Sequence, residues 1–200
     1  LRMQGIKVVP IPCDTNMLPV FETAKQLLNE KTKAIVLVTP NNPTGVEYPK
    51  ELLIKFSRFA RQNNIKLVID ETYKNFSERK ESNIIYKGKW KDHLIQLYSF
   101  SKVYRLTGHR VGLMVASTSF MKQVEKFLDT TTICPNRLAQ KAAYFGLRHL
   151  KGFVEEEKKK IKEIKTSFIN EVKTLTNWSL LGIGGYFAYL KYNSSSDSIS

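Results

Sequence analysis

The chain has 200 residues, of which 42% are hydrophobic and 25% charged, and this is typical of a globular protein with one sizeable core. No apolar run is long enough to cross a bilayer and no signal-peptide pattern opens the chain, so we expect a cytoplasmic protein without a membrane partner. The net charge of +14 would suit nucleic acid. Lysines and glutamates are nevertheless mixed in blocks such as residues 155–160, where opposite charges lie three and four residues apart on a helix surface, so we expect no nucleic-acid partner.

The cysteines and histidines show no metal-ligand spacing. Cys13 and Cys134 lie far apart and outside any redox motif, which predicts two free thiols. The three histidines, His93, His109 and His149, are equally isolated from one another. We therefore expect no metal site.

The hydrophobic pattern along the chain is that of an α/β protein. The apolar runs at 34–38 and 65–69 have the continuous hydrophobicity of buried parallel strands, and the segment between them carries its apolar residues on one helical stripe. In chain order we expect strands at 6–11, 34–38, 65–69, 94–100, 111–115, 178–181 and 185–190, helices at 21–29, 49–62, 119–128, 136–149 and 153–175, and a polar surface excursion at 77–91. The short gap before 111–115 favours a hairpin-like pair in an otherwise parallel sheet. We therefore predict a mostly parallel sheet flanked by helices.

The last part of the chain predicts a second, smaller unit. Gly152 breaks the pattern, and a long helix such as the one expected at 153–175 commonly connects a large domain to a small one. We assign residues 1–150 to part of a large domain and 151–192 to the connecting helix and the first strands of a small α+β domain. Residues 193–200 form a polar tail.

Three residues with useful chemistry follow expected strands: Asn42, Asp70 and Lys102. In open α/β sheets, ligands bind at the edge formed by the carboxyl ends of the strands. Lys102 lies in a Ser-x-Ser-Lys turn, eight positions before Arg110. A lysine in such a turn can form a Schiff base with a phosphorylated aldehyde, while Ser99 and Arg110 are placed to hold the phosphate.

Each residue type fits one part of a pyridoxal ring. The Asp70 carboxylate would pair with the ring nitrogen and keep it protonated, which makes the ring an electron sink. Tyr73 and Asn42 can donate hydrogen bonds to the phenolic oxygen of the ring. Once displaced by a substrate amine, Lys102 is free to move the proton at the substrate Cα. Taken singly, an Asp at a strand end is often a helix cap and Asn-Pro often only a turn, but their combination at strand ends favours a cofactor site.

The chain resembles a known family over four motifs, from about Gly5 to about Tyr192. The motifs are PNNPTG at 40–45, DETY at 70–73, SFSK at 99–102 and GHRVG at 108–112. They are similar to those of the class I/II aminotransferases, which are fold-type-I pyridoxal-phosphate enzymes. The resemblance implies that Lys102 carries the cofactor and that its ring is contacted by Asn42, Asp70 and Tyr73. It further implies that Ser99 and Arg110 hold the phosphate and that Ser101, beside the lysine, belongs to the cofactor-binding set.

The resemblance also implies parts that this chain does not supply. Family members are about twice as long, with a glycine-containing phosphate cup and a ring-stacking aromatic residue in their N-terminal part. Their C-terminal part carries an arginine that grips the substrate carboxylate. We therefore expect the chain to be the central cofactor-binding portion of a larger enzyme, with weak cofactor binding of its own. The family usually builds its site across a dimer interface, which implies a homodimer at full length.

The implied activity is the transfer of an amino group between an amino acid and a 2-oxo acid. The named residues activate the substrate Cα without choosing which bond breaks, so a lyase, decarboxylase or synthase stays open as an alternative. A non-catalytic aminotransferase-like module that only binds a ligand is a second alternative.

Overall fold

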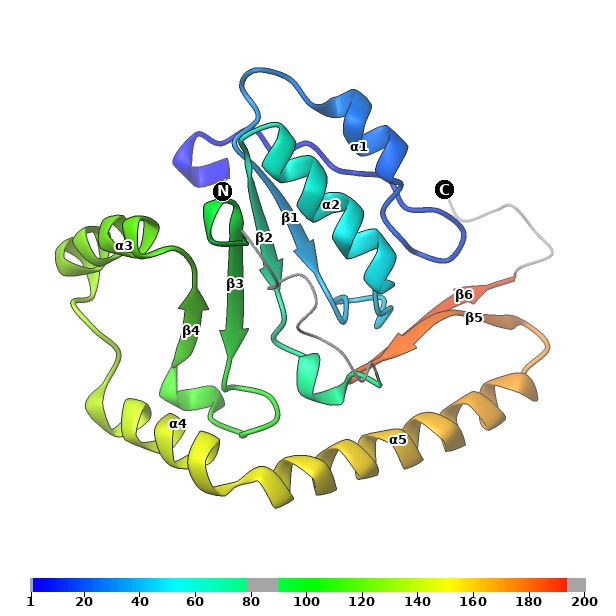
Figure 1. Ribbon diagram of the computed structural model, residues 1–200. Helices are drawn as coiled ribbons and strands as arrows, with labels where there is room; N and C mark the ends of the chain where they lie inside the picture. Colours follow the sequence, from blue (N-terminus) through cyan, green and yellow to red (C-terminus); the bar gives the residue numbers. More distant parts are fainter. Residues whose placement is uncertain (1, 79–89, 194–200) are drawn as a thin grey trace.

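The computed structural model of the protein describes residues 2–78 and 90–193, and a four-stranded sheet forms its centre (Figure 1). The strands, in spatial order, are β1 (Ala34–Val38), β2 (Lys66–Asp70), β3 (Leu94–Ser99) and β4 (Gly112–Val115). β1, β2 and β3 run parallel, and β4 pairs antiparallel with β3. The predicted mostly parallel sheet with one hairpin-like pair is therefore confirmed.

Two helices close one part of the core over β1 and β2. They are α1 (Phe21–Leu27) and α2 (Lys50–Gln62), and α2 begins directly after Pro49, whose fixed φ suits a helix start. The apolar stripe of α2 turns inward, and Phe56 and Ala60 are fully buried. The buried cluster that the helices share with the strands comprises Ala24, Ile35, Leu37, Tyr48, Leu53, Phe56, Ala60, Ile65, Leu67, Ile69 and Leu94.

Three helices follow the sheet: α3 (Thr118–Thr131), α4 (Arg137–His149) and α5 (Lys151–Lys173). α4 places Ala139 and Ala143 in a second buried cluster, where these small residues contact the larger rings of Tyr98 and Phe100. None of the helices among the described residues is long and apolar enough to span a membrane.

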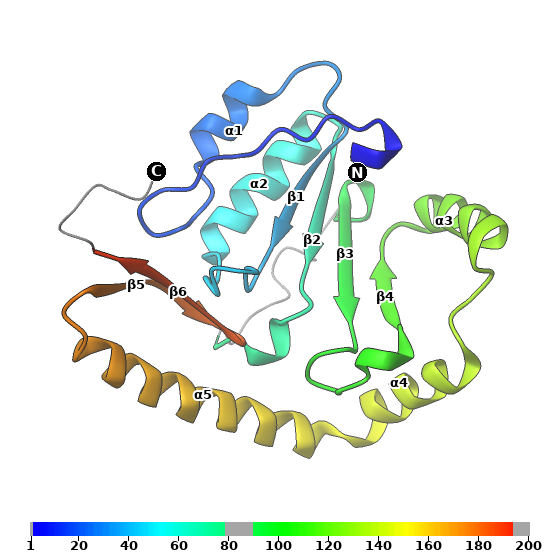
Figure 2. The ribbon, with the colours of Figure 1, turned by 180° about the vertical axis from the view of Figure 1, so that it is seen from behind.

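The long helix α5 lies across the carboxyl ends of the parallel strands. In both views the arrowheads of β1, β2 and β3 point towards α5, while that of β4 points away (Figure 1 and Figure 2). After α5 in the chain, strands β5 (Trp178–Gly184) and β6 (Phe187–Tyr192) form a separate antiparallel sheet. Four short 3-10 helices complete the described elements: η1 (Arg2–Gln4), η2 (Lys74–Phe76), η4 (Trp90–Asp92) and η5 (Thr107–His109).

α5 and the β5–β6 hairpin pack directly against the carboxyl edge of the main sheet. Val154 of α5 lies in a third buried cluster with Tyr73, Phe76 and Val103. The hairpin backbone touches the loop after β1, because a Cβ atom added to Gly184 would overlap the carbonyl oxygen of Gly45. The hairpin therefore helps to enclose this edge, while the division of the chain into two domains at residue 150 stays a prediction.

The strand predicted at 6–11 is wrong. These residues form no strand, and Ile6, Val8 and Val9 are exposed. Pro10 and Pro12 lack the amide hydrogen that strand pairing requires, so the segment is poorly suited to a ladder. Among the described residues, the nearest pairing is an isolated bridge between Cys13 and Pro19.

Several boundaries also differ from the prediction. Gly152 does not break a helix, since α5 begins at Lys151 and the break between α4 and α5 falls at Leu150. α3 continues to Thr131, beyond the predicted end at 128. β6 begins at 187 rather than 185, because the positive φ of Gly185 (55°) places it in the turn. Most of the excursion predicted at 77–91 lies outside the described residues.

Candidate functional site

The strand register brings the predicted site residues to one edge of the sheet. Asp70, the last residue of β2, is opposite Val38 of β1 on one side and Leu97 of β3 on the other. β3 ends at Ser99, three positions before Lys102. The turns that follow β1, β2 and β3 therefore leave the sheet at the same edge, which is the edge that faces α5 (Figure 2).

Asp70 is held by the residue two positions later. One carboxylate oxygen, Oδ1, accepts hydrogen bonds from the backbone N–H of Thr72 at 2.9 Å and from its hydroxyl at 2.6 Å. Among the residues that the structure describes, no hydrogen bond reaches the other oxygen, Oδ2. The half-buried carboxylate is thus fixed in orientation and keeps one acceptor for a further donor.

The buried ring of Tyr73 contacts several side chains at this edge. Its side chain is 5% exposed, and its ring makes edge contacts with Phe187 at 4.9 Å and Tyr186 at 6.1 Å between centroids. The amine of Lys102 lies 5.6 Å from the centroid of the same ring. Lys102 and Tyr73 thus meet, although they follow different strands.

The turn that carries Lys102 is closed by several hydrogen bonds. Ser99 Oγ accepts from the N–H of Ser101 at 3.2 Å, and the Thr107 hydroxyl donates to the carbonyl of Ser101 at 2.8 Å. The N–H of Arg105 donates to the carbonyl of Lys102 at 2.9 Å. Ser101 is buried and its main chain is used inside the turn, whereas the Ser99 hydroxyl hydrogen is still available to an acceptor.

Arg110 follows the turn in a left-handed conformation, with a φ of 50°. Its side chain is exposed, and Nη1 donates to the carbonyl of Thr107 at 2.9 Å. Among the described residues, no hydrogen bond joins Arg110 to Ser99. The guanidinium therefore lies on the surface of the lysine turn, and it has to exchange an internal hydrogen bond if it binds an anion.

Asn42 lies in a turn that its neighbour Asn41 holds together. Asn41 Oδ1 accepts from the hydroxyl of Thr44 at 2.9 Å, and Asn41 Nδ2 donates to the hydroxyl of Tyr48 at 3.2 Å. Burial raises the pKa of Tyr48 to about 12, so its hydroxyl stays neutral. Asn42 itself is exposed, and its amide is therefore accessible to a ligand.

The polar groups at this edge suit an anionic pyridine ring that carries an aldehyde and a phosphate. They comprise one amine, one oriented carboxylate with an accessible oxygen, a phenol, an amide, a hydroxyl and a guanidinium. The amine is the group that forms a covalent bond with an aldehyde, and the carboxylate oxygen suits a protonated ring nitrogen. No cluster of metal-ligating side chains is found among residues 2–78 and 90–193, and the two cysteines are free and exposed.

Sequence reasoning missed the residues that orient the site. Thr72 could have been found, because a hydroxyl two positions after an aspartate is typical of a local side-chain turn. Glu157 of α5 was missed as well. It is 7% exposed and binds Arg105 in the lysine turn at 2.6 Å. Since the two residues are 52 positions apart, no local pattern marks the pair.

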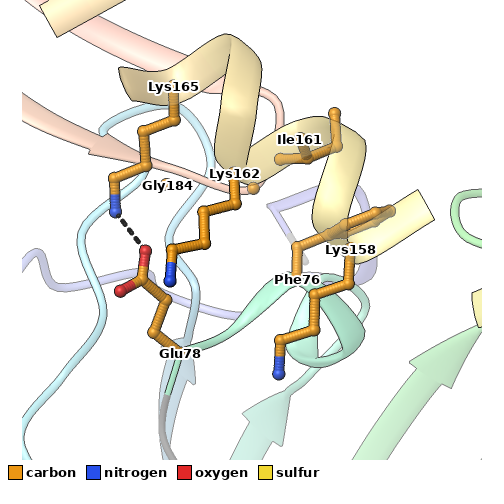
Figure 3. Close-up of a pocket in the computed structure, with 8 residues that line it drawn as sticks. Phe76, Glu78, Lys158, Ile161, Lys162, Lys165 and Gly184 are labelled. Carbon is orange, nitrogen blue, oxygen red and sulfur yellow. Dashed lines mark hydrogen bonds and ion pairs between the residues drawn. The ribbon is translucent and has the colours of Figure 1, made fainter. Parts of the chain in front are cut away.

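A surface hollow lies beside the site, between α5 and the segment that follows Tyr73 (Figure 3). Lys158, Lys162 and Lys165 extend from α5 on this side; Lys162 and Lys165 point towards Glu78, and Lys165 contacts it at 3.0 Å. The three lysines lower the pKa of the Glu78 carboxyl, Lys165 most strongly through its hydrogen bond. The Lys165–Glu78 contact joins α5 to the segment that follows Tyr73, and none of the sequence-predicted site residues lines the hollow.

Comparison with known sequences gives one consistent family. The family described as aminotransferase class I and II matches residues 1–199. The aspartate aminotransferase of Thermotoga maritima is 33% identical over 168 residues, which are 78% of this chain and 45% of that protein. The glutamate-pyruvate aminotransferase of Haemophilus influenzae is 38% identical over 126 residues, which are 58% of this chain and 29% of that protein.

Solved structures share the fold. An aspartate aminotransferase from Thermus thermophilus with maleate has a TM-score of 0.82 at 25% identity and covers 92% of this chain and 49% of its own. The alanine aminotransferase from Pyrococcus furiosus has a TM-score of 0.78 at 26% identity, with 90% and 48% covered. The chain thus spans about half the length of these solved structures and less than half of the curated relatives.

Proposed function

Because the chain belongs to the class I and II aminotransferase family, we propose that it is the cofactor-binding portion of a pyridoxal-phosphate-dependent aminotransferase. Such an enzyme moves an amino group between an amino acid and a 2-oxo acid. The observation that supports the proposal most strongly is the Lys102 amine over the Tyr73 ring, 5.6 Å from its centroid, at the edge where Asp70 ends β2. An amine, a phenol and a carboxylate at one strand edge are what a pyridoxal ring requires.

Pyridoxal phosphate, when bound, supplies an electron sink for the charge left at the substrate Cα after a proton is removed. In the proposed site Lys102 attaches the cofactor and, once released, moves the proton at Cα. Asp70 holds the ring nitrogen protonated through Oδ2, since Oδ1 is occupied by Thr72. Tyr73 and Asn42 donate to the phenolic oxygen.

Ser99 and Arg110 hold the phosphate in this proposal, with Ser101 next to them in the lysine turn. Ser99 contributes its hydroxyl hydrogen, and Arg110 contributes a bidentate guanidinium. The exposed Arg110 side chain gives up its hydrogen bond to the Thr107 carbonyl when it turns towards the phosphate. A guanidinium–phosphate bond, in which both partners are charged, is stronger than the guanidinium–carbonyl bond that it replaces, in which only the donor is charged.

The relatives guide the choice of substrates. Their names contain the amino acids aspartate and glutamate and the 2-oxo acid pyruvate, and we propose small amino acids of this kind as amino donors and small 2-oxo acids as acceptors. At full length the protein would act as a cytoplasmic homodimer. Residues 1–150 would belong to its cofactor domain and 151–192 to the connection into a small domain.

Reductive trapping tests the proposal on the chain as it is. Pyridoxal phosphate is added, borohydride fixes any covalent adduct, and peptide mass mapping locates it. The expected adduct is on Lys102, and it is absent from Lys102→Arg. Lys74 is a comparison lysine, since its amine also lies over a tyrosine ring, 5.2 Å from the centroid of Tyr98, although it additionally pairs with Glu71 at 3.8 Å.

An adduct that forms on Lys74 as readily as on Lys102 would contradict the proposed site, because mere placement over an aromatic ring would then explain both.

Product analysis addresses the reaction itself. With aspartate, glutamate or alanine, amino transfer yields the corresponding 2-oxo acid. Release of carbon dioxide or of a side-chain fragment would instead indicate a decarboxylase or lyase.

A further inference from the structure

A buried carboxylate joins the long helix to the turn that carries Lys102. Glu157 of α5 is 7% exposed, although α5 is otherwise rich in exposed charges. Arg105 Nη2 donates to Glu157 Oε2 at 2.6 Å, and Lys160 Nζ donates to Oε1 at 3.1 Å. Both carboxylate oxygens are therefore used, as a buried charge requires.

Arg105 links this carboxylate to the lysine through its own backbone. Its N–H donates to the Lys102 carbonyl at 2.9 Å, and its guanidinium lies 5.5 Å from the centroid of the Phe153 ring. Its φ of 55° is disfavoured for a residue with a side chain, so contacts elsewhere have to maintain it. Glu157 and Phe153, both on α5, make those side-chain contacts.

A second contact presses the same turn against the same helix. Val103, the residue after Lys102, is 1% exposed and packs in the cluster that contains Val154 and Tyr73. Val154 and Glu157 are three positions apart, so they lie on one face of α5. This face thus contacts two residues that follow Lys102 in the turn, and it also contacts the ring against which the lysine amine lies.

We propose that Glu157 is a positioning residue that acts through Arg105 to hold the Lys102 amine against Tyr73. α5 leads into the β5–β6 hairpin, whose Phe187 also contacts Tyr73. The helix therefore fixes both the lysine turn and the hairpin that packs on the Tyr73 ring. The inference rests on the proposed function, in which Lys102 is the residue that attaches the cofactor. Glu157 itself touches neither substrate nor cofactor.

Competitive labelling of lysines tests this without any cofactor. The chain is treated with trace acetic anhydride, and the labelling of Lys102 is divided by that of Lys126, an exposed lysine on α3. In the parent chain the half-buried Lys102 should label more slowly than Lys126. In Glu157→Gln the released turn should raise the ratio by roughly threefold or more, because local opening exposes the amine.

The matched control is Glu163→Gln, the same substitution on the same helix. Glu163 is exposed and pairs only loosely with Lys159, at 3.9 Å, so the labelling ratio should not change. Arg105→Gln removes the same ion pair at its exposed partner, since the arginine side chain is 65% exposed. This variant replaces Glu157→Gln in the test if Glu157→Gln does not fold. The double variant Arg105→Glu with Glu157→Arg should restore part of the parent ratio, which loss of packing alone would not do.

The outcomes separate this inference from the proposed function. If the folded variants Glu157→Gln and Arg105→Gln have the same Lys102-to-Lys126 labelling ratio as the parent, Glu157 does not position the lysine. Absence of a pyridoxyl adduct on Lys102 in the parent overturns the proposed function, yet the labelling ratio still decides whether α5 positions the turn. If both hold, borohydride trapping at limiting cofactor should fall in Glu157→Gln and not in Glu163→Gln.

Discussion

The Lys102 amine and the Tyr73 ring lie 5.6 Å apart, measured from Nζ to the ring centroid. Each residue follows a different strand, and neither position is fixed by its own turn alone. Tyr73 is held by Phe187 of the hairpin, and the Lys102 turn is held by α5. Among the described residues no carboxylate pairs with the Lys102 amine, so it is available for a covalent bond at the strand edge.

The hydroxyl and the ring of Tyr73 can be separated by substitution. Tyr73→Phe keeps the ring contacts and removes the proposed donor to the cofactor, so cofactor affinity should fall about tenfold, which corresponds to one lost hydrogen bond of about 1.4 kcal/mol. Its free energy of unfolding should change by less than about 1 kcal/mol. Cofactor titration and urea unfolding measure the two quantities.

Tyr73→Ala is the contrasting variant, since it removes the buried ring. Its free energy of unfolding should fall by about 3–5 kcal/mol, the usual cost of removing a buried aromatic side chain. Cofactor affinity equal to that of the parent in folded Tyr73→Phe would show that the hydroxyl does not face the cofactor.

The positions of the parallel strands were the most predictable part of the fold. The runs at 34–38 and 65–69 match β1 (Ala34–Val38) and β2 (Lys66–Asp70) closely, because a continuous apolar run is typical of parallel strands. The expected burial of β1 on both faces is wrong, since Ala34 and Val36 are exposed. The break between α4 and α5 was misplaced because glycine was read as a helix breaker. Gly152 costs only about 1 kcal/mol in a helix, and the apolar face of α5 outweighs that cost.

The site was predictable only where its residues follow strand ends in the chain. Asp70 ends one apolar run and Lys102 lies in the turn after another, so their common edge could be inferred from the parallel topology. The Arg105–Glu157 pair could not be inferred, because three consecutive glutamates occupy 155–157 and only Glu157 turns inward. Which one is buried depends on how α5 is seated against the lysine turn, and that is a tertiary property.

Substitution by alanine should have opposite effects at Gly45 and Gly152, because only Gly45 lies in the close contact between the Asn42 turn and the hairpin. Gly45 has a φ of 74°, and a Cβ atom there would lie 2.8 Å from Ile183 C and from the Phe187 carbonyl oxygen. Gly45→Ala should therefore destabilise the protein by about 1–3 kcal/mol. Gly152→Ala, which meets nothing within 4 Å in a helix, should stabilise it by about 0.5–1 kcal/mol.

Urea unfolding of both variants measures the difference, and near-ultraviolet circular dichroism reports on the aromatic contacts of Tyr73 with the hairpin. A Gly45→Ala protein as stable as the parent would mean that the hairpin does not rest on the Asn42 turn.

Acid should weaken the contact between α5 and the lysine turn. The hydrogen bond from Arg105, assisted by Lys160, holds the pKa of the Glu157 carboxyl below its ordinary value of 4.5. The folded state therefore favours the carboxylate, and this stabilisation is complete above the ordinary value and is lost as pH falls through the lowered one. The difference in unfolding free energy between the parent and Glu157→Gln should shrink as pH falls from 6 to 3. The difference between the parent and Glu163→Gln serves as the control, and a Glu157→Gln difference independent of pH would contradict the ion pair.

His93 predicts a second pH dependence, in a higher range and away from the site. It is 6% exposed, its Nε2 lies 2.8 Å from the Ser57 hydroxyl oxygen, and its Nδ1 has no partner among the described residues. Burial, and secondarily the charge of Arg61, lowers the His93 pKa below its ordinary value of 6.5. The unfolded chain therefore binds a proton at a pH where the folded chain does not, and stability should fall as pH decreases from above 6.5 towards the lowered pKa.

The slope in this range has an upper limit of about 1.4 kcal/mol per pH unit for one group. His93→Gln should remove this part of the slope, whereas His149→Gln, at an exposed position on α4, controls for the loss of a histidine. Urea unfolding of the three proteins between pH 5 and 8 measures the slopes. If His93→Gln keeps the slope of the parent, the imidazole is protonated equally in the folded and unfolded states, and its burial against Ser57 does not occur in solution.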